Sequence, residues 1–326
     1  MIPAEFDEIR PYMPEELPAV YEELLADPEF QAAMGYVFKQ VPFEQVAAMI
    51  RGCKTNIEFQ KTIVLPFLQG LLKKLSTGIS LSYDNKESLA DALCISNHRD
   101  IILDSAFLCM LMIENVDNTV EIAIGDNLLI RPWIKKLVRV NRSFIVQRSA
   151  SIREMLASSK RLSSYIHYTI AERQQPIWIA QREGRAKDSN DRTQEGLIKM
   201  LSMYSREDII DALKVLNIAP TTISYANDPC DFLKAKEFQQ KRDNPEWKKA
   251  PQDGEKEDQN LLPDYAFRNI LISFLQRRYP LSFLRINSTT GREYCLRFFS
   301  FYTGAIEKSH IIWYTTGKGG VPWTGI

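Results

Sequence analysis

Residues 93–108 read LCISNHRDIILDSAFL, and they place a strand signal, a polar turn and a helix signal directly after one another. The apolar run LCIS is typical of a short buried strand, and the apolar spacing from about Asp100 onward is typical of a helix. Between the two lies His98, at the end of the strand. Because catalytic loops in α/β folds follow the carboxyl ends of strands, this stretch predicts an α/β fold with His98 as a candidate general base.

Short β-rich runs alternate with helical stretches from residue 78 to about residue 230. The β-rich runs lie at 78–83, 92–96, 120–125, 143–147, 176–180 and 220–225. The helical stretches lie at 100–114, 130–139, 151–174 and 194–216. This alternation predicts a mostly parallel central sheet flanked by helices, in one α/β domain at residues 78–238.

The sequences on either side of this region do not alternate between strand and helix signals. Residues 1–77 show helical spacing of apolar residues, with prolines near the helix starts, and predict an N-terminal helical region. Residues 239–260 contain only Trp247 and Ala250 as apolar residues, which predicts a polar linker or loop. Residues 261–326 include a basic and aromatic helical stretch, and we expect a helical C-terminal extension there.

Composition excludes several classes of protein. The 326 residues are 45% apolar and carry 41 basic and 41 acidic side chains, which is typical of a neutral globular protein and not of a disordered or collagen-like one. Five widely spaced cysteines without a CxxC pair favour a reducing cytoplasm over a disulfide-bonded secreted protein. The acidic N-terminus lacks the apolar core of a signal peptide, and the longest apolar run, 105–113, is about half a membrane span. We therefore expect a cytoplasmic protein without a spanning segment.

Three familiar catalytic patterns are missing. The tripeptide HRD (98–100) also occurs in protein kinases, but a kinase needs an asparagine five residues after this aspartate, where this chain has Ser105. The chain contains no GxSxG, so a serine hydrolase is not indicated. No metal site is expected either, because the three histidines are far apart and lack zinc-ligand spacing: His98, His167 and His310.

Residues 127–153 contain seven basic residues and no acidic one, a local charge of +7. The helix predicted within them is amphipathic, with Trp133 at its boundary. Such a helix fits an anionic membrane surface, and it fits equally a surface helix that packs its apolar stripe on the sheet. Nucleic acid is a poor partner, because aromatic residues are sparse here and the rest of the chain is neutral. Arg148 ends the predicted strand SFIVQR (143–148), at an edge where a phosphate would be bound.

Residues 176–190, PIWIAQREGRAKDSN, run from a predicted strand into a basic turn. Gly184 lets the backbone approach a ligand, and Arg182 and Arg185 offer the forked donors that suit phosphate. Lys187 adds a further cation. An exposed polar turn without a ligand is the competing interpretation.

Together, and in this order, these segments resemble the glycerolipid acyltransferases, which include glycerol-3-phosphate and lysophosphatidate acyltransferases. NHRDIILD (97–104) is similar to the family's NHxxxxD block, and SFIVQR (143–148) to its phosphate-binding arginine block. REGR (182–185) is similar to its EGT(R) block, and APTTISY (219–225) to its final proline-led strand. The resemblance covers residues 78–230.

The resemblance implies an O-acyltransferase with a histidine–aspartate general base. His98, oriented by Asp104, would take the proton from an acceptor hydroxyl as that hydroxyl attacks an acyl thioester. The implied donor is acyl-CoA or acyl carrier protein, and the implied acceptor is glycerol-3-phosphate or lysophosphatidate. No metal or other cofactor is implied. We expect a peripheral location at the inner face of an anionic membrane.

The resemblance also implies an acceptor site. Arg148 and Arg185, with Arg182 and Lys187, would bind the acceptor's phosphate, and Glu183 next to Gly184 would order the loop or bind the acceptor.

Two departures from the family pattern leave alternatives open. The family has four residues between its histidine and aspartate, whereas five separate His98 from Asp104. Asp100 is the alternative partner, unless it caps the following helix. The threonine of the EGT block is also missing, because Arg185 directly follows Gly184. The competing functions are acyl transfer to another lipid hydroxyl, such as that of an acylated amino-acid lipid, and a non-catalytic lipid-binding protein on the same fold.

Overall fold

A five-stranded parallel sheet lies at the centre of the computed structural model, which describes residues 2–76, 78–83, 89–129, 131–148, 151–186, 190–204, 208–244 and 246. The strand order is β3-β2-β4-β1-β5, and every pairing is parallel. The strands are β1 (Leu93–Ser96), β2 (Glu121–Gly125), β3 (Ser143–Val146), β4 (Ile177–Ala180) and β5 (Ile218–Thr221). The predicted α/β class with a parallel sheet is confirmed.

One predicted strand is wrong and one is shifted. Residues 78–83 form no strand, although their alternating pattern resembles one. The predicted strand 220–225 is paired only up to Thr221, because β5 begins two residues earlier, at Ile218. Alternation alone does not reveal whether a neighbouring strand is there to pair with.

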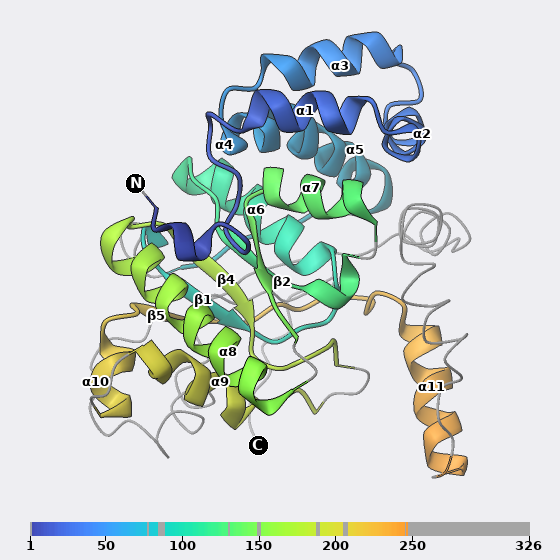
Figure 1. Cartoon of the computed structure of the whole chain (residues 1–326). Helices are drawn as coiled ribbons and strands as arrows, with labels where there is room; N and C mark the ends of the chain where they lie inside the picture. The colour runs from blue at the N-terminus through green and yellow to red at the C-terminus, as the bar shows by residue number, and fades with distance from the viewer. Residues whose placement is uncertain are drawn as a thin grey trace.

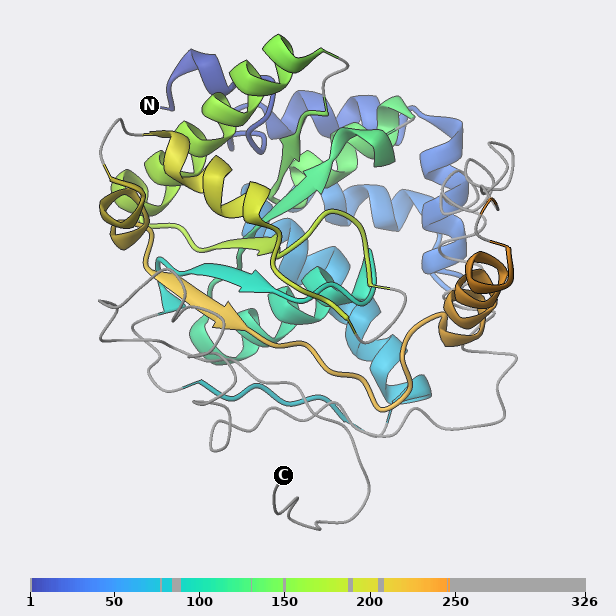
Figure 2. The ribbon, with the colours of Figure 1, turned by 90° about the horizontal axis from the view of Figure 1, so that it is seen from below.

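Helices cover both faces of the sheet, and the strand residues alternate between them. Cys94, Trp178 and Ala219 pack towards α6 (Leu103–Val116). Leu93, Ile95, Ile177 and Ile179 pack on the other face, against α8 (Ile152–His167), which continues as a π-helical segment to Glu172. Figure 2 shows α6 and α8 on opposite sides of the sheet. Two short helices, α9 (Glu195–Leu201) and α10 (Ile209–Lys214), contribute to the α8 side.

The N-terminal residues form a separate helical layer. Its helices are α1 (Leu17–Leu25), α2 (Pro28–Val37), α3 (Phe43–Gly52), α4 (Asn56–Phe59), a π-helical segment (Gln60–Val64) and α5 (Leu65–Leu75). Figure 1 shows α1, α2 and α3 above α7 (Pro132–Val140) and the sheet. The boundary between this layer and the α/β domain stays a prediction.

The apolar stripe of α7 is buried against this helical layer. Trp133, Ile134 and Val140 belong to the same core as α1, α2 and α3. The Trp133 indole donates to Glu29 (2.8 Å), and the buried Arg139 donates to the carbonyl oxygens of Arg10 and Asp7. The stripe is packed against protein, but the expected partner is the sheet, whereas the observed partner is mainly the N-terminal helices. A stripe that is buried in this way is not exposed to a lipid surface.

The described chain ends in a charged helix, α11 (Asp231–Asp243). This helix corrects the expected linker, because residues 239–243 continue it for more than a turn. The rest of 239–260 lies largely outside the described residues, and the expected extension at 261–326 lies outside them completely. Within the described part of the chain, no helix combines the length and the apolar character that crossing a bilayer requires.

Candidate active site

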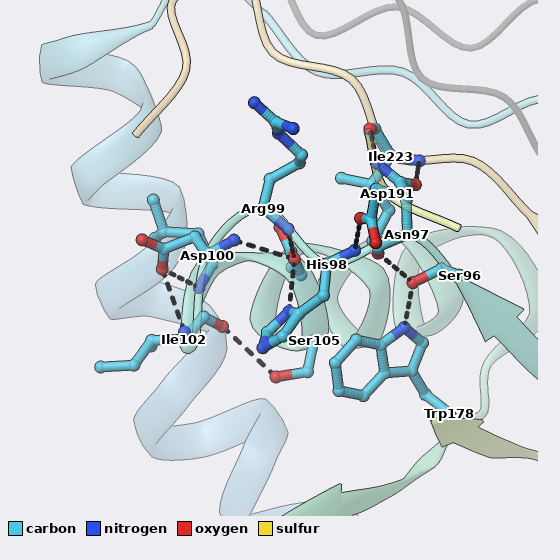
Figure 3. A network of polar contacts seen from close by, with 12 residues as sticks. Ser96, Asn97, His98, Arg99, Asp100, Ile102, Ser105, Trp178, Asp191 and Ile223 are labelled. Atoms are coloured by element: carbon cyan, nitrogen blue, oxygen red, sulfur yellow. Dashed lines mark hydrogen bonds and ion pairs between the residues drawn. The ribbon is translucent and has the colours of Figure 1, made fainter. Parts of the chain in front are cut away.

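The loop after β1 holds His98 by its backbone and its neighbours. Asn97 receives a hydrogen bond from the backbone N–H of Ile223 (2.7 Å) and donates one to the carbonyl of the same residue (2.8 Å). The backbone N–H of His98 donates to Asp191 Oδ2 (2.7 Å), and its carbonyl accepts from Ala186 (2.7 Å). These contacts, visible in part in Figure 3, join the loop to the segments after β4 and β5.

The imidazole of His98 is paired with Asp104. The distance from His98 Nδ1 to Asp104 Oδ2 is 2.9 Å, and the Asp104 side chain is completely buried. The edge-on ring of Trp178 lies beside the imidazole, with 5.7 Å between ring centroids. Because Nδ1 faces the carboxylate, Nε2 lies on the opposite side of the ring.

The turn before α6 accommodates the additional residue between His98 and Asp104. The helix begins only at Leu103, and the backbone N–H groups of Arg99 and Asp100 donate to Asp104 Oδ2 at 2.7 and 2.9 Å. The Asp100 side chain instead accepts from Ile102 and Leu103, and so caps the first turn. The structure thus places Asp104 beside the histidine. Asp100 takes the capping role instead, and its contact with Ile102 is drawn in Figure 3.

A large cavity opens beside His98. Its volume is about 1460 Å³, and His98 lines it. Apolar side chains of α5 and α6 form part of the wall, among them Leu65, Leu68, Ala106 and Met110. Polar lining comes from Arg148, Arg182, Glu183 and Arg185. The cavity therefore combines a charged region and an apolar region around one imidazole.

Arg148 lies at the end of β3 and is paired with a residue of the loop after β4. Its Nη1 is 2.7 Å from Glu183 Oε1, and both side chains are partly exposed. Gly125, at the end of β2, leaves room for this arginine, because a Cβ there would lie 3.3 Å from Arg148 Nε and 2.6 Å from Asn127 Oδ1. Gly184 has a φ of 70°, a conformation that side chains other than glycine rarely adopt. The backbone conformation at position 184 thus explains why the predicted loop has a glycine there.

The other predicted cations are distributed around the loop. Arg182 donates to the Asn190 carbonyl (3.3 Å) and lies 4.0 Å from Asp191. Arg185 lies near the thiol of Cys230: burial raises the pKa of this thiol, and the positive charge of Arg185 partly offsets that effect. Lys187 lies outside the described residues. The structure therefore gives Arg148 a carboxylate partner and places Arg185 near the Cys230 thiol.

Several neighbours of the site come from distant parts of the chain. Tyr225 donates its hydroxyl to Asp104 Oδ1 at 2.6 Å. Lys234 is buried, and its Nζ donates to the Arg99 carbonyl (2.7 Å) and to Asp228 (2.6 Å). Burial lowers the pKa of Lys234, and Asp228 partly offsets this effect. Sequence patterns cannot reveal these contacts, because 121 residues separate Tyr225 from Asp104 and 135 separate Lys234 from Arg99.

The comparison with protein families assigns the class of this domain. Residues 80–203 match the model of the Acyltransferase family. This range contains β1 to β4, the His98–Asp104 pair, Arg148 and the loop at 182–185. These residues form an acyltransferase domain of the glycerolipid acyltransferase family, and the protein is an acyltransferase. A search of curated proteins gives no match to the chain.

Proposed function

We propose that the protein transfers a fatty acyl group from an acyl thioester to a hydroxyl of glycerol-3-phosphate or lysophosphatidate. The observation that carries the proposal is the His98–Asp104 contact of 2.9 Å at the wall of a cavity with both charged and apolar lining. A pairing of this kind orients an imidazole for proton transfer, and the cavity has room for an acyl chain beside a polar head group.

In the proposed reaction His98 is the general base. Asp104 accepts a hydrogen bond from Nδ1–H of His98, and this tautomer leaves the lone pair on Nε2. Nε2 takes the proton of the acceptor hydroxyl while its oxygen attacks the thioester carbonyl carbon. The carbon–sulfur bond then breaks, and the thiolate leaves with the proton from the imidazolium. A positioned base contributes roughly 10²- to 10⁴-fold to such a rate. The attacking oxygen belongs to the substrate, so the protein needs no nucleophile of its own.

The acceptor's phosphate would be bound at Arg148. A phosphate oxygen would compete with Glu183, which pairs with this arginine at 2.7 Å in the present arrangement. Arg182, Arg185 and Lys187 are proposed as further cationic contacts around the same loop. Acyl-CoA or acyl carrier protein is the proposed donor, and the reaction as written uses no metal or cofactor.

The apolar part of the cavity would bind the acyl chain. The volume of about 1460 Å³ exceeds the roughly 300–1,000 Å³ of ordinary small-molecule pockets. We therefore place a long acyl chain along α5 and α6, whose apolar side chains line the cavity.

The tip of α8 is the proposed contact with an anionic membrane. We define the tip as Ile152, Arg153, Met155, Leu156 and Lys160. The exposed fractions of its apolar residues are 83% for Ile152, 52% for Met155 and 57% for Leu156. The two cations complement an anionic lipid surface, and the same helix lines the cavity at Ser158 and Leu162. A protein that contacts the inner face of the membrane here would receive its lipid substrate directly.

One observation favours a second acceptor class. The charge of Arg148 is already compensated by Glu183, so a lipid hydroxyl without a phosphate, such as that of an acylated amino-acid lipid, is the alternative. The 2.9 Å contact between His98 and Asp104 supports a catalytic protein over a non-catalytic lipid-binding one.

A panel of acceptors with one radiolabelled long-chain acyl-CoA tests the proposal. We expect label in lysophosphatidate or phosphatidate when glycerol-3-phosphate or lysophosphatidate is supplied. If label appeared only in a phosphate-free lipid, the acceptor would be that lipid class and not glycerol-3-phosphate or lysophosphatidate. The absence of labelled product from acyl-CoA and from acyl carrier protein, with every acceptor, would contradict the proposal.

A further inference from the structure

The segment after β5 reaches back to the candidate catalytic pair, although it lies beyond the residues that match the family model. That match ends at residue 203, whereas β5 begins at Ile218. The Asn97 side chain hydrogen-bonds both the backbone N–H and the carbonyl of Ile223, and these bonds hold the segment after β5 against the loop after β1. Two residues further on, the Tyr225 hydroxyl donates to Asp104 Oδ1 at 2.6 Å.

The Asp104 carboxylate is held from both of its oxygens. Oδ2 accepts from His98 Nδ1 and from the backbone N–H groups of Arg99 and Asp100. Within the described part of the chain, Oδ1 has one hydrogen-bond partner, the Tyr225 hydroxyl. A carboxylate bound through Oδ2 alone can rotate about its Cβ–Cγ bond, since that torsion is broad. The tyrosine hydroxyl restricts this rotation.

The ring of Tyr225 is held independently of its hydroxyl. It packs against two apolar clusters, one that includes Leu68 and Phe107 and one that includes Leu108 and Ile223. Replacement by phenylalanine would keep this packing and remove the hydroxyl that donates to Asp104. The substitution therefore separates the effect of the hydroxyl from that of the ring.

We propose that Tyr225 is a positioning residue of the active site, which fixes the Asp104 carboxylate and through it the tautomer and orientation of His98. The proposal rests on the proposed roles of His98 and Asp104. The buried Lys234, which binds the Arg99 carbonyl and Asp228, anchors the same C-terminal segment to the histidine loop from a second side.

The kinetic test is Tyr225→Phe, measured with saturating and limiting concentrations of each substrate. We expect kcat to fall roughly tenfold, the size of one lost hydrogen bond to a charged group, with KM for both substrates unchanged. In an Asp104→Asn background the same substitution should change kcat by less than about twofold, because its effect passes through the carboxylate. A kcat of Tyr225→Phe within twofold of wild type, or an equal loss in both backgrounds, would overturn the proposal.

Tyr165→Phe is the matched control. The Tyr165 hydroxyl also donates to a buried carboxylate, that of Glu121 (2.5 Å), but this pair lies at the amino end of β2, and neither residue lines the cavity. We expect this control to lower thermal stability and to leave kcat unchanged, whereas Tyr225→Phe should do the reverse.

A spectroscopic measurement tests the placement without any substrate. The chain has only three histidines, so ¹⁵N-histidine labelling with His98→Gln for assignment isolates the His98 signals. At a pH where the imidazole is neutral, wild type should show the tautomer protonated on Nδ1, and Tyr225→Phe should show a mixture of tautomers. An unchanged tautomer would overturn the proposal. Because the measurement needs no turnover, failure of the acyl-transfer assay and failure of this inference are distinguishable.

Discussion

Arg148 is the residue whose proposed role depends most on an exchange of partners, from Glu183 to the acceptor's phosphate. Its guanidinium is bound to Glu183 and half exposed, and Gly125 leaves space for it above β2. An arginine in such a position can release a surface carboxylate, whose attraction in water is weak, and bind a phosphate through two parallel hydrogen bonds. In this interpretation the Glu183 carboxylate occupies the position on Arg148 that the acceptor's phosphate would take.

The first prediction concerns this arginine. Arg148→Ala should raise KM for glycerol-3-phosphate roughly ten- to a hundredfold, the size of one or two lost charge-assisted hydrogen bonds, with a smaller change in kcat. Steady-state kinetics over a range of acceptor concentrations measures both constants. Arg51→Ala is the matched control, because Arg51 forms a similarly exposed pair with Glu22 (2.7 Å) among the N-terminal helices. An unchanged KM in Arg148→Ala would point to the phosphate-free acceptor.

At the scale of single elements, α8 and α9 are joined through a buried histidine. His167, at the end of α8, donates from Nε2 to the Leu201 carbonyl (2.9 Å) and stacks on Tyr204. Its Nδ1 is buried without a partner among the described residues. Burial lowers the pKa of this imidazole, so the folded protein holds it neutral.

The second prediction follows from that direction. An unfolded histidine titrates near pH 6.5, and the folded His167 titrates lower, so the unfolded chain takes up the proton first as pH falls. Above about pH 6.5 His167 is neutral in both states and costs the folded protein nothing. As pH falls below this value, protonation of the unfolded chain lowers the free energy of unfolding. Urea unfolding at pH 7.5 and 5.5 should show a larger drop in the free energy of unfolding for wild type than for His167→Gln. Equal drops in the two proteins would contradict the assignment.

The helix α7 shows what an element's own sequence does and does not determine. Its amphipathic pattern correctly predicts a helix, because the pattern depends on local spacing. The pattern cannot tell lipid from protein as the partner of the apolar stripe, and the partner is decided by helices more than 80 residues earlier in the chain. The strands could be predicted for a related reason: buried parallel strands are continuous apolar runs. Among the described residues, 78–83 is the predicted run that forms no strand.

The candidate site divides in the same way. His98 and the loop at 182–185 could be predicted because strand ends and glycine turns are local signals. The choice between Asp100 and Asp104 depended on where α6 begins, which sequence-based prediction places only to within a few residues. Tyr225 and Lys234 could not be predicted, because their contacts depend on the packing of the segment after β5.

At the scale of the whole molecule, three parts meet at one edge of the sheet. The strand ends supply His98 and Arg148, α5 of the N-terminal layer supplies apolar wall to the cavity, and the segment after β5 supplies Tyr225. The exposed tip of α8 projects beside the same cavity. This arrangement would let a lipid enter the site from a membrane while the acyl thioester is supplied from the aqueous side.

The third prediction concerns the tip of α8. The triple variant Ile152→Ser, Met155→Ser and Leu156→Ser should reduce co-sedimentation with phosphatidylglycerol vesicles at least fivefold, because about 25 cal/mol is lost for each Å² of apolar surface no longer buried. Turnover of a water-soluble acceptor should not change. Val215→Ser, at another exposed apolar position, is the control. Full vesicle binding by the triple variant would assign membrane contact to a different part of the chain.

The most direct test of the central claim is thiol release from a long-chain acyl-CoA, with and without glycerol-3-phosphate or lysophosphatidate, for wild type and His98→Ala. We predict acceptor-dependent release by wild type and a loss of roughly 10²-fold or more in His98→Ala, with circular dichroism showing the same fold for both. Acceptor-dependent release at the wild-type rate in His98→Ala would contradict this prediction.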